Sequence, residues 1–146
     1  MDNKLKEPVE RIMGKIGRMF QAAVQENLTK LDIDRSFYPL LLIEAGKGIT
    51  QQELSRELSC DKVQVVRIID YLSSHGYVER IQNKTDRRKY ELTITQKAKR
   101  VLPNIKKAIL ETSSISLKGL SEKQIVELYG TLSIIESNIQ SYNKLV

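Results

Sequence analysis

Residues 50–76 read TQQELSRELSCDKVQVVRIIDYLSSHG, and this stretch decides the fold. Thr50 and Glu53 have the spacing of a capping box, in which the threonine side chain accepts a hydrogen bond from the glutamate amide and the glutamate side chain reaches back. This pair predicts the start of a short helix over 51–58. A second helix is predicted over 61–75, so the stretch reads as two helices joined by a tight turn.

The second of these helices is amphipathic. Gly76 follows it at the place where a left-handed residue ends a helix. On a helical wheel the apolar side chains gather on one side, which predicts a face packed on a core. The core-facing residues are Val65, Ile68, Ile69 and Leu72, and the residues of the opposite face are Val63, Arg67, Asp70 and Ser74.

The period of the pattern changes after this helix. Residues 77–82 and 89–94 alternate as strands, and the polar, basic tip NKTDRR between them predicts a β-hairpin. Apolar residues at helical spacing predict further helices on both sides of the hairpin and its helix pair. These helices are expected over 4–30, 36–45 and 95–114, and from a second capping box at Ser121 onward. The fold class is therefore mainly α, with a helix-turn-helix and a β-hairpin wing.

Composition limits the class of protein. At 146 residues and 40% hydrophobic, the chain is expected to form one ordinary globular domain. No apolar run approaches the ~20 residues of a membrane span. The N-terminus does not resemble a secretory signal. The single cysteine cannot form an internal disulfide, which favours a cytoplasmic location.

The charge is unevenly distributed. The formal net charge is +6, yet residues 79–107 alone hold ten Lys/Arg against three Asp/Glu. A basic excess concentrated in one part of the chain favours a polyanionic partner. A solvated helix face would show the same excess, so charge alone leaves both interpretations open.

The sequence lacks the residue arrangements that mark the common kinds of enzyme site. One histidine and one cysteine make no recognisable metal cluster. The chain also has no Ser-His-Asp order and no Gly-rich phosphate loop. We therefore expect no catalytic residues, no metal and no cofactor.

A helix-turn-helix places the N-terminal residues of its second helix in the major groove of double-stranded DNA. Arg67 would then pair with guanine, Val63 would meet a thymine methyl group, and Lys62 would contact a phosphate. Gln64 either reaches a base or closes the helix start with Asp61, and Arg67 has the alternative of a solvated surface arginine. The wing tip is expected to insert arginine into the minor groove. Its candidates are Lys84, Arg87 and Arg88, with Asp86 pairing one of the two arginines.

The run LSRELSCDKVQVVRIIDYLSSHGYVERIQNKTDRRKYELTIT, residues 54–95, resembles the MarR (multiple antibiotic resistance regulator) family of winged helix-turn-helix proteins. The order and spacing of four groups carry the resemblance. They are Leu54 with Leu58, the Asp61-Lys62 pair with the helix after it, the Gly76-Tyr77-Val78-Glu79-Arg80 run, and Asp86-Arg87-Arg88 before Ile94-Thr95.

The resemblance implies a homodimeric transcription regulator that binds a pseudo-palindromic operator, and since many members of the family repress genes, a repressor is expected. It implies a DNA-binding lobe over about 34–95, with N- and C-terminal dimerisation helices over 1–33 and 96–146. Arg67 and Gln64 would face the major groove, and Arg87 or Arg88 the minor groove. Val63, Gln64 and Val66 stand where small hydroxylic residues are usual, so the base readout is expected to differ from that of the family.

A small, often phenolic ligand releases DNA from many members of this family. The ligand-binding candidates here are Met13, Met19, Phe20, Phe37 and Tyr38, which also fit ordinary core and interface positions. Cys60 precedes a helix N-terminus, which can lower a thiol pKa, so a redox-sensing regulator is one alternative. Others are a non-specific nucleic-acid-binding module and a protein-interaction module with a winged-helix fold.

Overall fold

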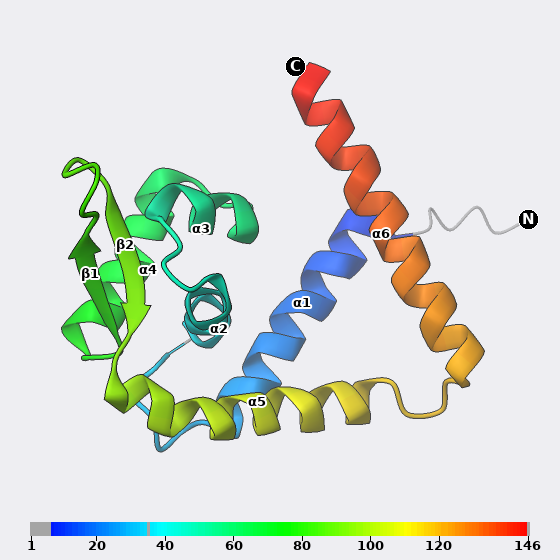
Figure 1. Cartoon of the computed structure of the whole chain (residues 1–146). Helices are drawn as coiled ribbons and strands as arrows, with labels where there is room; N and C mark the ends of the chain where they lie inside the picture. Colours follow the sequence, from blue (N-terminus) through cyan, green and yellow to red (C-terminus); the bar gives the residue numbers. More distant parts are fainter. Residues whose placement is uncertain (1–6, 35, 146) are drawn as a thin grey trace, which may run out of the picture. The chain divides into compact units, whose positions relative to one another are not determined.

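A computed structural model describes residues 7–34 and 36–145, and it shows a largely helical chain with one β-hairpin (Figure 1). The fold class predicted from the sequence is confirmed. The expected residues 4–6 of the first helix lie outside the described residues. The elements in chain order are α1 Val9–Glu26, α2 Phe37–Gly46, α3 Gln51–Leu58, α4 Lys62–Ser74, β1 Val78–Gln82, β2 Tyr90–Ile94, α5 Gln96–Ser116 and α6 Glu122–Leu145.

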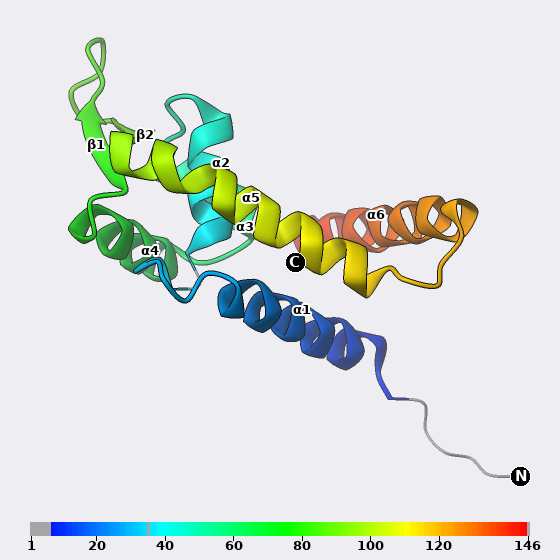
Figure 2. The same cartoon turned by 90° about the horizontal axis from the view of Figure 1, so that it is seen from below.

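The chain divides into two compact units, residues 1–110 and 111–146. The first unit contains α1 to α4, the hairpin and the first part of α5. Figure 2 follows the chain from the base of the hairpin directly into α5. Among the described residues no helix is both long enough and apolar enough to cross a lipid bilayer.

The start of α3 has the predicted capping box. Thr50 Oγ1 accepts a hydrogen bond from the Glu53 amide at 3.2 Å, and the Glu53 carboxylate accepts from the Thr50 amide at 2.8 Å. These hydrogen bonds from Thr50, the backbone one first, lower the pKa of Glu53. The tight turn after α3 passes through Ser59, which has a φ of 49°. The two helices of the helix-turn-helix therefore begin and end where local chemistry places them.

The end of α4 is a Schellman motif. The Tyr77 amide donates to the Leu72 carbonyl at 2.8 Å, and the Gly76 amide donates to the Ser73 carbonyl at 3.0 Å. Gly76 has a φ of 76°, a conformation that costs a side-chain-bearing residue energy. The predicted helix stop is confirmed, and it turns the chain directly into the hairpin.

The core of the first unit gathers residues from every element in it. The predicted inner face of α4 is buried or half-buried, and its predicted outer face is exposed. α2 packs on α3 and β2, and α4 packs on α3 and β1. The fully buried side chains include Val24, Ile33, Phe37, Leu40, Leu54, Val65, Ile69, Leu72, Tyr77, Ala98 and Ile105.

The wing is tied to the helix-turn-helix by a short third strand segment. β1 and β2 pair antiparallel, from Val78 opposite Ile94 to Gln82 opposite Tyr90. The Leu92 amide also donates to the Ile49 carbonyl at 2.8 Å, just before the α3 cap. A two-stranded hairpin alone is only marginally stable. The additional pairing therefore holds the wing at a defined position beside α3.

The second unit begins with the end of α5 and contains α6. The predicted capping box is present: the Gln124 amide donates to Ser121 Oγ at 3.2 Å, and the Ser121 amide donates to the Gln124 side chain at 2.9 Å. Many apolar side chains of α6 are exposed. They include Val126, Leu128, Tyr129, Leu132, Ile134, Ile139 and Tyr142.

Candidate nucleic-acid interface

The N-terminal half of α4 presents the predicted DNA-reading residues on one exposed surface. Lys62, Val63, Gln64 and Arg67 are all exposed, with Val63 at 62% although it is apolar. Asp61 Oδ1 accepts a hydrogen bond from the Gln64 amide at 2.8 Å, so Asp61 is a helix cap. In the described part of the chain the Gln64 side chain makes no reciprocal bond to Asp61. It therefore stays available to a ligand.

An ion pair next to these residues neutralises the one carboxylate on the exposed face of α4. Arg80 on β1 donates to Asp70 Oδ1 at 2.6 Å. Asp70 lies one turn after Arg67, and without a partner it would compete for the Arg67 guanidinium. Arg67 forms no ion pair with any of the residues that the structure describes. Sequence reasoning missed this pair because a helix end and a turn separate its members.

The wing tip is ordered by its own polar side chains. Asn83 Oδ1 accepts from the Thr85 amide at 2.8 Å and from the Asp86 amide at 3.0 Å. Asp86 Oδ1 accepts from the Arg88 amide at 3.1 Å and from Arg88 Nε at 3.3 Å. The predicted pairing of Asp86 with one arginine is thus with Arg88. Arg87 and Lys84 are exposed on the same tip.

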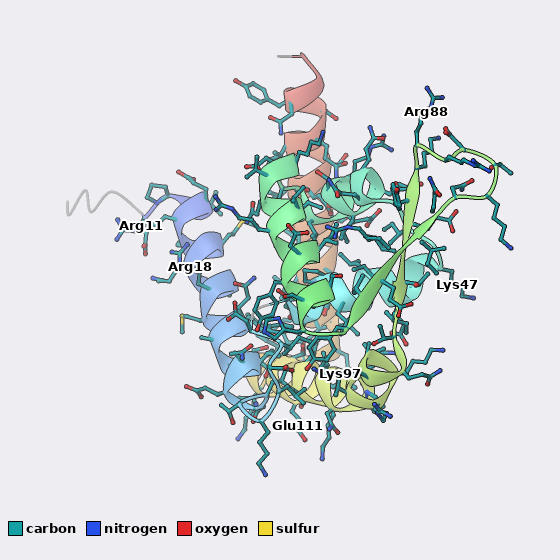
Figure 3. The ribbon with its side chains drawn as sticks, turned by 90° about the vertical axis from the view of Figure 1, so that its left-hand side faces the viewer. Arg11, Arg18, Lys47, Arg88, Lys97 and Glu111 are labelled. Carbon is teal, nitrogen blue, oxygen red and sulfur yellow. The ribbon has the colours of Figure 1, made fainter. Side chains whose placement is uncertain are left out.

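The Asp86–Arg88 pair does not bury the arginine. The Arg88 side chain is 91% exposed, and it points away from the ribbon (Figure 3). Exposed ion pairs contribute little free energy and are screened by salt. The pair therefore orients Arg88 without withholding its guanidinium from a second partner.

A groove of about 660 Å³ lies between the tip-side end of the wing, α3 and the start of α4. Four cationic side chains line it, together with the Glu53 carboxylate that the α3 cap already uses. Sequence analysis named two of these cations and missed Arg56 and Lys89. The basic run at the wing pointed to Lys89, but only the packing of α3 beside the wing brings Arg56 to the same groove. The four cations are Arg56, Lys62, Arg88 and Lys89.

The candidate ligand-binding residues do not gather around one cavity. Phe37 is fully buried in the core, and its ring packs on the half-buried Tyr38 ring with centroids 4.7 Å apart. Phe20 is half-buried on α1, whereas Met13 and Met19 are exposed there. A second cavity of about 410 Å³ is lined by other residues. These are Glu44, Ile94, Lys99, Leu102, Pro103 and Lys106.

Cys60 lies half-buried in the turn between α3 and α4. Its carbonyl accepts a hydrogen bond from Ser55 Oγ at 2.7 Å. Burial, followed by the nearby Asp61 carboxylate, raises the pKa of the Cys60 thiol. The thiol is therefore in an environment that disfavours the reactive thiolate.

We expect Cys60 to react slowly with electrophiles. At pH 7.5 its alkylation by iodoacetamide should be slower than that of glutathione, because a raised pKa leaves less thiolate at that pH. Mass spectrometry of the intact chain measures the rate. Alkylation in denaturant should approach the glutathione rate and serves as the control. A folded-state rate above that of glutathione would contradict the assignment and favour a redox-sensing cysteine.

Comparisons with known proteins agree on one class. The model of the MarR family matches residues 34–89. The chain is 29% identical over 100 residues to the HTH-type transcriptional regulator BilQ of Clostridioides difficile, covering 68% of each chain. It is 23% identical over 131 residues to the uncharacterized HTH-type transcriptional regulator YybA of Bacillus subtilis, covering 89% of this chain and 87% of that one.

Solved structures show the same architecture. A putative MarR family transcriptional regulator from Listeria monocytogenes, in complex with a 26mer DNA, superposes with a TM-score of 0.85 at 26% identity. That match covers 91% of this chain and 89% of the other. The transcriptional regulator SlyA superposes with a TM-score of 0.88 at 23% identity, over 92% and 96% of the two chains. The second likeness establishes the fold.

Proposed function

We propose that the chain is a transcriptional regulator of the MarR family and that it binds an operator in double-stranded DNA through α4 and the wing. Proteins of this family are regulators, and the chain is not an enzyme. The Listeria structure contains DNA, which supports the same partner here. A cytoplasmic location is consistent with this partner.

The observation that carries the proposal is the position of the cationic groove beside the exposed face of α4. Arg56, Arg88 and Lys89 come from α3 and from the wing, and Lys62 opens α4. Phosphate contacts of this kind position a protein on the duplex but carry no sequence information. With the backbone held in the groove, Val63, Gln64 and Arg67 would face the base edges of the major groove.

The wing extends this surface to a second groove of the duplex. We assign Arg87 to the minor groove, because Arg88 lines the cationic groove beside α3. Arginine is favoured where A·T-rich sequence narrows the minor groove and concentrates negative potential. Lys84 would contact phosphate at the tip.

These assignments predict different effects for two neighbouring arginines. Arg87→Ala should weaken binding most on operators with A·T-rich flanks, whereas Arg88→Ala should weaken binding on all flanks to a similar degree. The reason is that one side chain reads groove width and the other contacts the backbone. Titrations with duplexes that differ only in their flanks measure both variants side by side. Equal flank dependence in the two variants would contradict the assignment.

We also propose a homodimer, which the exposed apolar side chains of the helices at both ends of the chain support. Val9, Ile16 and Met19 on α1 are exposed, as are many side chains of α6. Exposed apolar patches of this extent mark association surfaces, and symmetric pairing buries the same patch on both chains. We further propose that the dimer acts as a repressor and that a small aromatic or phenolic ligand releases it from DNA. A DNA-binding lobe over about 34–95 with dimerisation helices on both sides belongs to the same proposal.

Selection from a random duplex library, followed by binding titrations at two salt concentrations, tests this function. We expect an enriched pseudo-palindrome with half-sites about one helical turn apart. Salt-sensitive binding without an enriched motif would reject specific regulation in favour of a non-specific nucleic-acid binder. No binding to any duplex would favour a protein-interaction module.

A further inference from the structure

A group of side chains outside the DNA-facing surface joins the end of α4 to the segment between α1 and α2. We call this group the Asp32 cluster. All of its members belong to the first unit of the chain. They are Asp32, Tyr71, His75, Tyr77 and Lys97.

Asp32 accepts hydrogen bonds from the side chains of three residues that are distant from it in the sequence. Its carboxylate accepts from the Tyr77 hydroxyl and from Lys97 Nζ, the latter at 3.1 Å. Its backbone carbonyl accepts from the Tyr71 hydroxyl at 2.8 Å. The Tyr77 hydrogen bond, and after it the Lys97 one, lower the pKa of the Asp32 carboxyl. Asp32 is therefore ionised at neutral pH and held by all three donors.

The same donors reach the end of α4. Lys97, at the start of α5 (Figure 3), also donates to the His75 carbonyl at 2.6 Å. His75 is the C-cap residue of α4, and its ring stacks on the Tyr71 ring with centroids 4.0 Å apart. The Lys97 ammonium lies 4.3 Å from the centroid of the Tyr77 ring. Asp32, in the α1–α2 segment, is thus the common contact of three places in the chain. They are the last turn of α4, Tyr77 just after the helix stop, and the start of α5.

Within the cluster, Asp32 itself has the features of a positioning residue rather than of a core residue. Leu28 and Ile33, on either side of Asp32, are buried and supply the apolar packing of the segment. The Asp32 side chain is 53% exposed and buries little apolar surface. Exposed ion pairs contribute little to folding free energy. What Asp32 contributes is a fixed geometry between α4 and the segment that leads from α1.

We propose that Asp32 is a positioning residue for DNA recognition, which holds the C-terminal end of α4 against the α1–α2 segment. This inference rests on the proposed function. In a dimer formed through α1 and α6, each α4 must enter the major groove at a fixed distance and angle from its symmetry mate. The Asp32 cluster is the polar connection from the α1 side to α4. Loss of the cluster should make the position of α4 less well defined, whereas the DNA-contacting side chains of α4 would remain unchanged.

Asp32→Asn in the full chain tests the proposal. The amide retains the size of the side chain but loses the charge that binds Lys97. Preference for the selected operator over a random-sequence duplex should fall about tenfold, because residues that couple elements typically change affinity by this order. Binding to the random duplex should change less than about twofold, since phosphate contacts remain. A purely structural loss would lower both affinities together and would also lower the melting temperature.

Three controls make the result specific to the cluster. Glu26→Gln makes the same change of charge on an exposed residue near the end of α1, and it should leave both affinities unchanged. Tyr77→Phe removes only the hydroxyl that donates to Asp32, and it should lose preference in the same direction. The double variant of Asp32 and Tyr77 should be no worse than the poorer single variant, because the two side chains act through one contact.

Amide hydrogen exchange over residues 69–77 supplies a readout that does not depend on DNA. Exchange in this segment should be faster in Asp32→Asn, because the end of α4 loses a constraint. If the wild type prefers the selected operator over the random duplex and Asp32→Asn keeps that preference unchanged, the positioning role is overturned. A wild type that prefers no duplex rejects the proposed function and this role with it. Faster exchange in the variant would then show only that the cluster restrains α4.

Discussion

Removal of residues 121–146 is expected to abolish the dimer and to lower affinity for the full operator by about 10²–10⁴-fold. This range is the usual gain from linking two binding modules, which a monomer on a single half-site lacks. The truncation removes α6, which carries more exposed apolar side chains than a solvated helix needs. The truncated chain keeps all the core residues of the first unit.

Sedimentation and light scattering measure the state of the truncated chain, and titration with the selected operator measures its affinity. Aggregation in place of monomer is compatible with exposed apolar faces on α1. A stable, soluble dimer would contradict the assignment of α6 to the interface. A finer comparison uses two neighbouring residues of α6, the exposed apolar Ile134 and the exposed polar Ser133. Ile134→Asp should dissociate the dimer and Ser133→Asp should not, if the apolar face is the interface.

Arg67→Ala is expected to lose base discrimination while the dimer remains intact. A bidentate arginine–guanine pair contributes about 1–3 kcal/mol of discrimination against the wrong base. Arg67 is exposed on α4, and the Arg80–Asp70 pair removes the carboxylate that would otherwise compete for it. Arg67→Lys should recover affinity but only part of the discrimination, because an ammonium cannot reproduce the planar fork.

The measurement is the ratio of dissociation constants on the selected operator and on variants of it with one substituted base pair. Lys62→Ala is the matched control on the same helix, since its expected phosphate contact should weaken all duplexes alike. Loss of affinity for every duplex in Arg67→Ala, with unchanged ratios, would show that this residue contacts only the backbone.

Elements with local signals were predictable from the sequence. The Thr50–Glu53 cap, the amphipathic face of α4 and the stop at Gly76 depend on residues within one or two turns of each other, and all three are confirmed. The candidate base-reading residues lie together on α4 because a helical wheel orders them directly. Local spacing also named Asp86 as the partner of a wing arginine, which the structure identifies as Arg88.

Contacts across long separations were not predictable from spacing. The hydrogen bond from Lys97 to Asp32 joins residues that no periodic pattern relates, and so does the Leu92 amide that donates to Ile49. Arg56 was missed for the same reason, since its place in the cationic groove depends on how α3 packs beside the wing. Such contacts arise from tertiary packing, for which a single sequence carries no local signal.

The hydrogen bonds inside the wing tip have a calorimetric consequence. Asn83 and Asp86 already bind the amides of Thr85 and Arg88, so the tip is folded before any duplex arrives. Segments that fold on binding show a large negative heat-capacity change and an entropy penalty for ordering. Here the heat-capacity change should reflect buried surface alone, and the entropy of binding should be dominated by counterions released from the duplex. The wing is therefore expected to bind the nucleic acid in its preformed conformation and not to fold on binding.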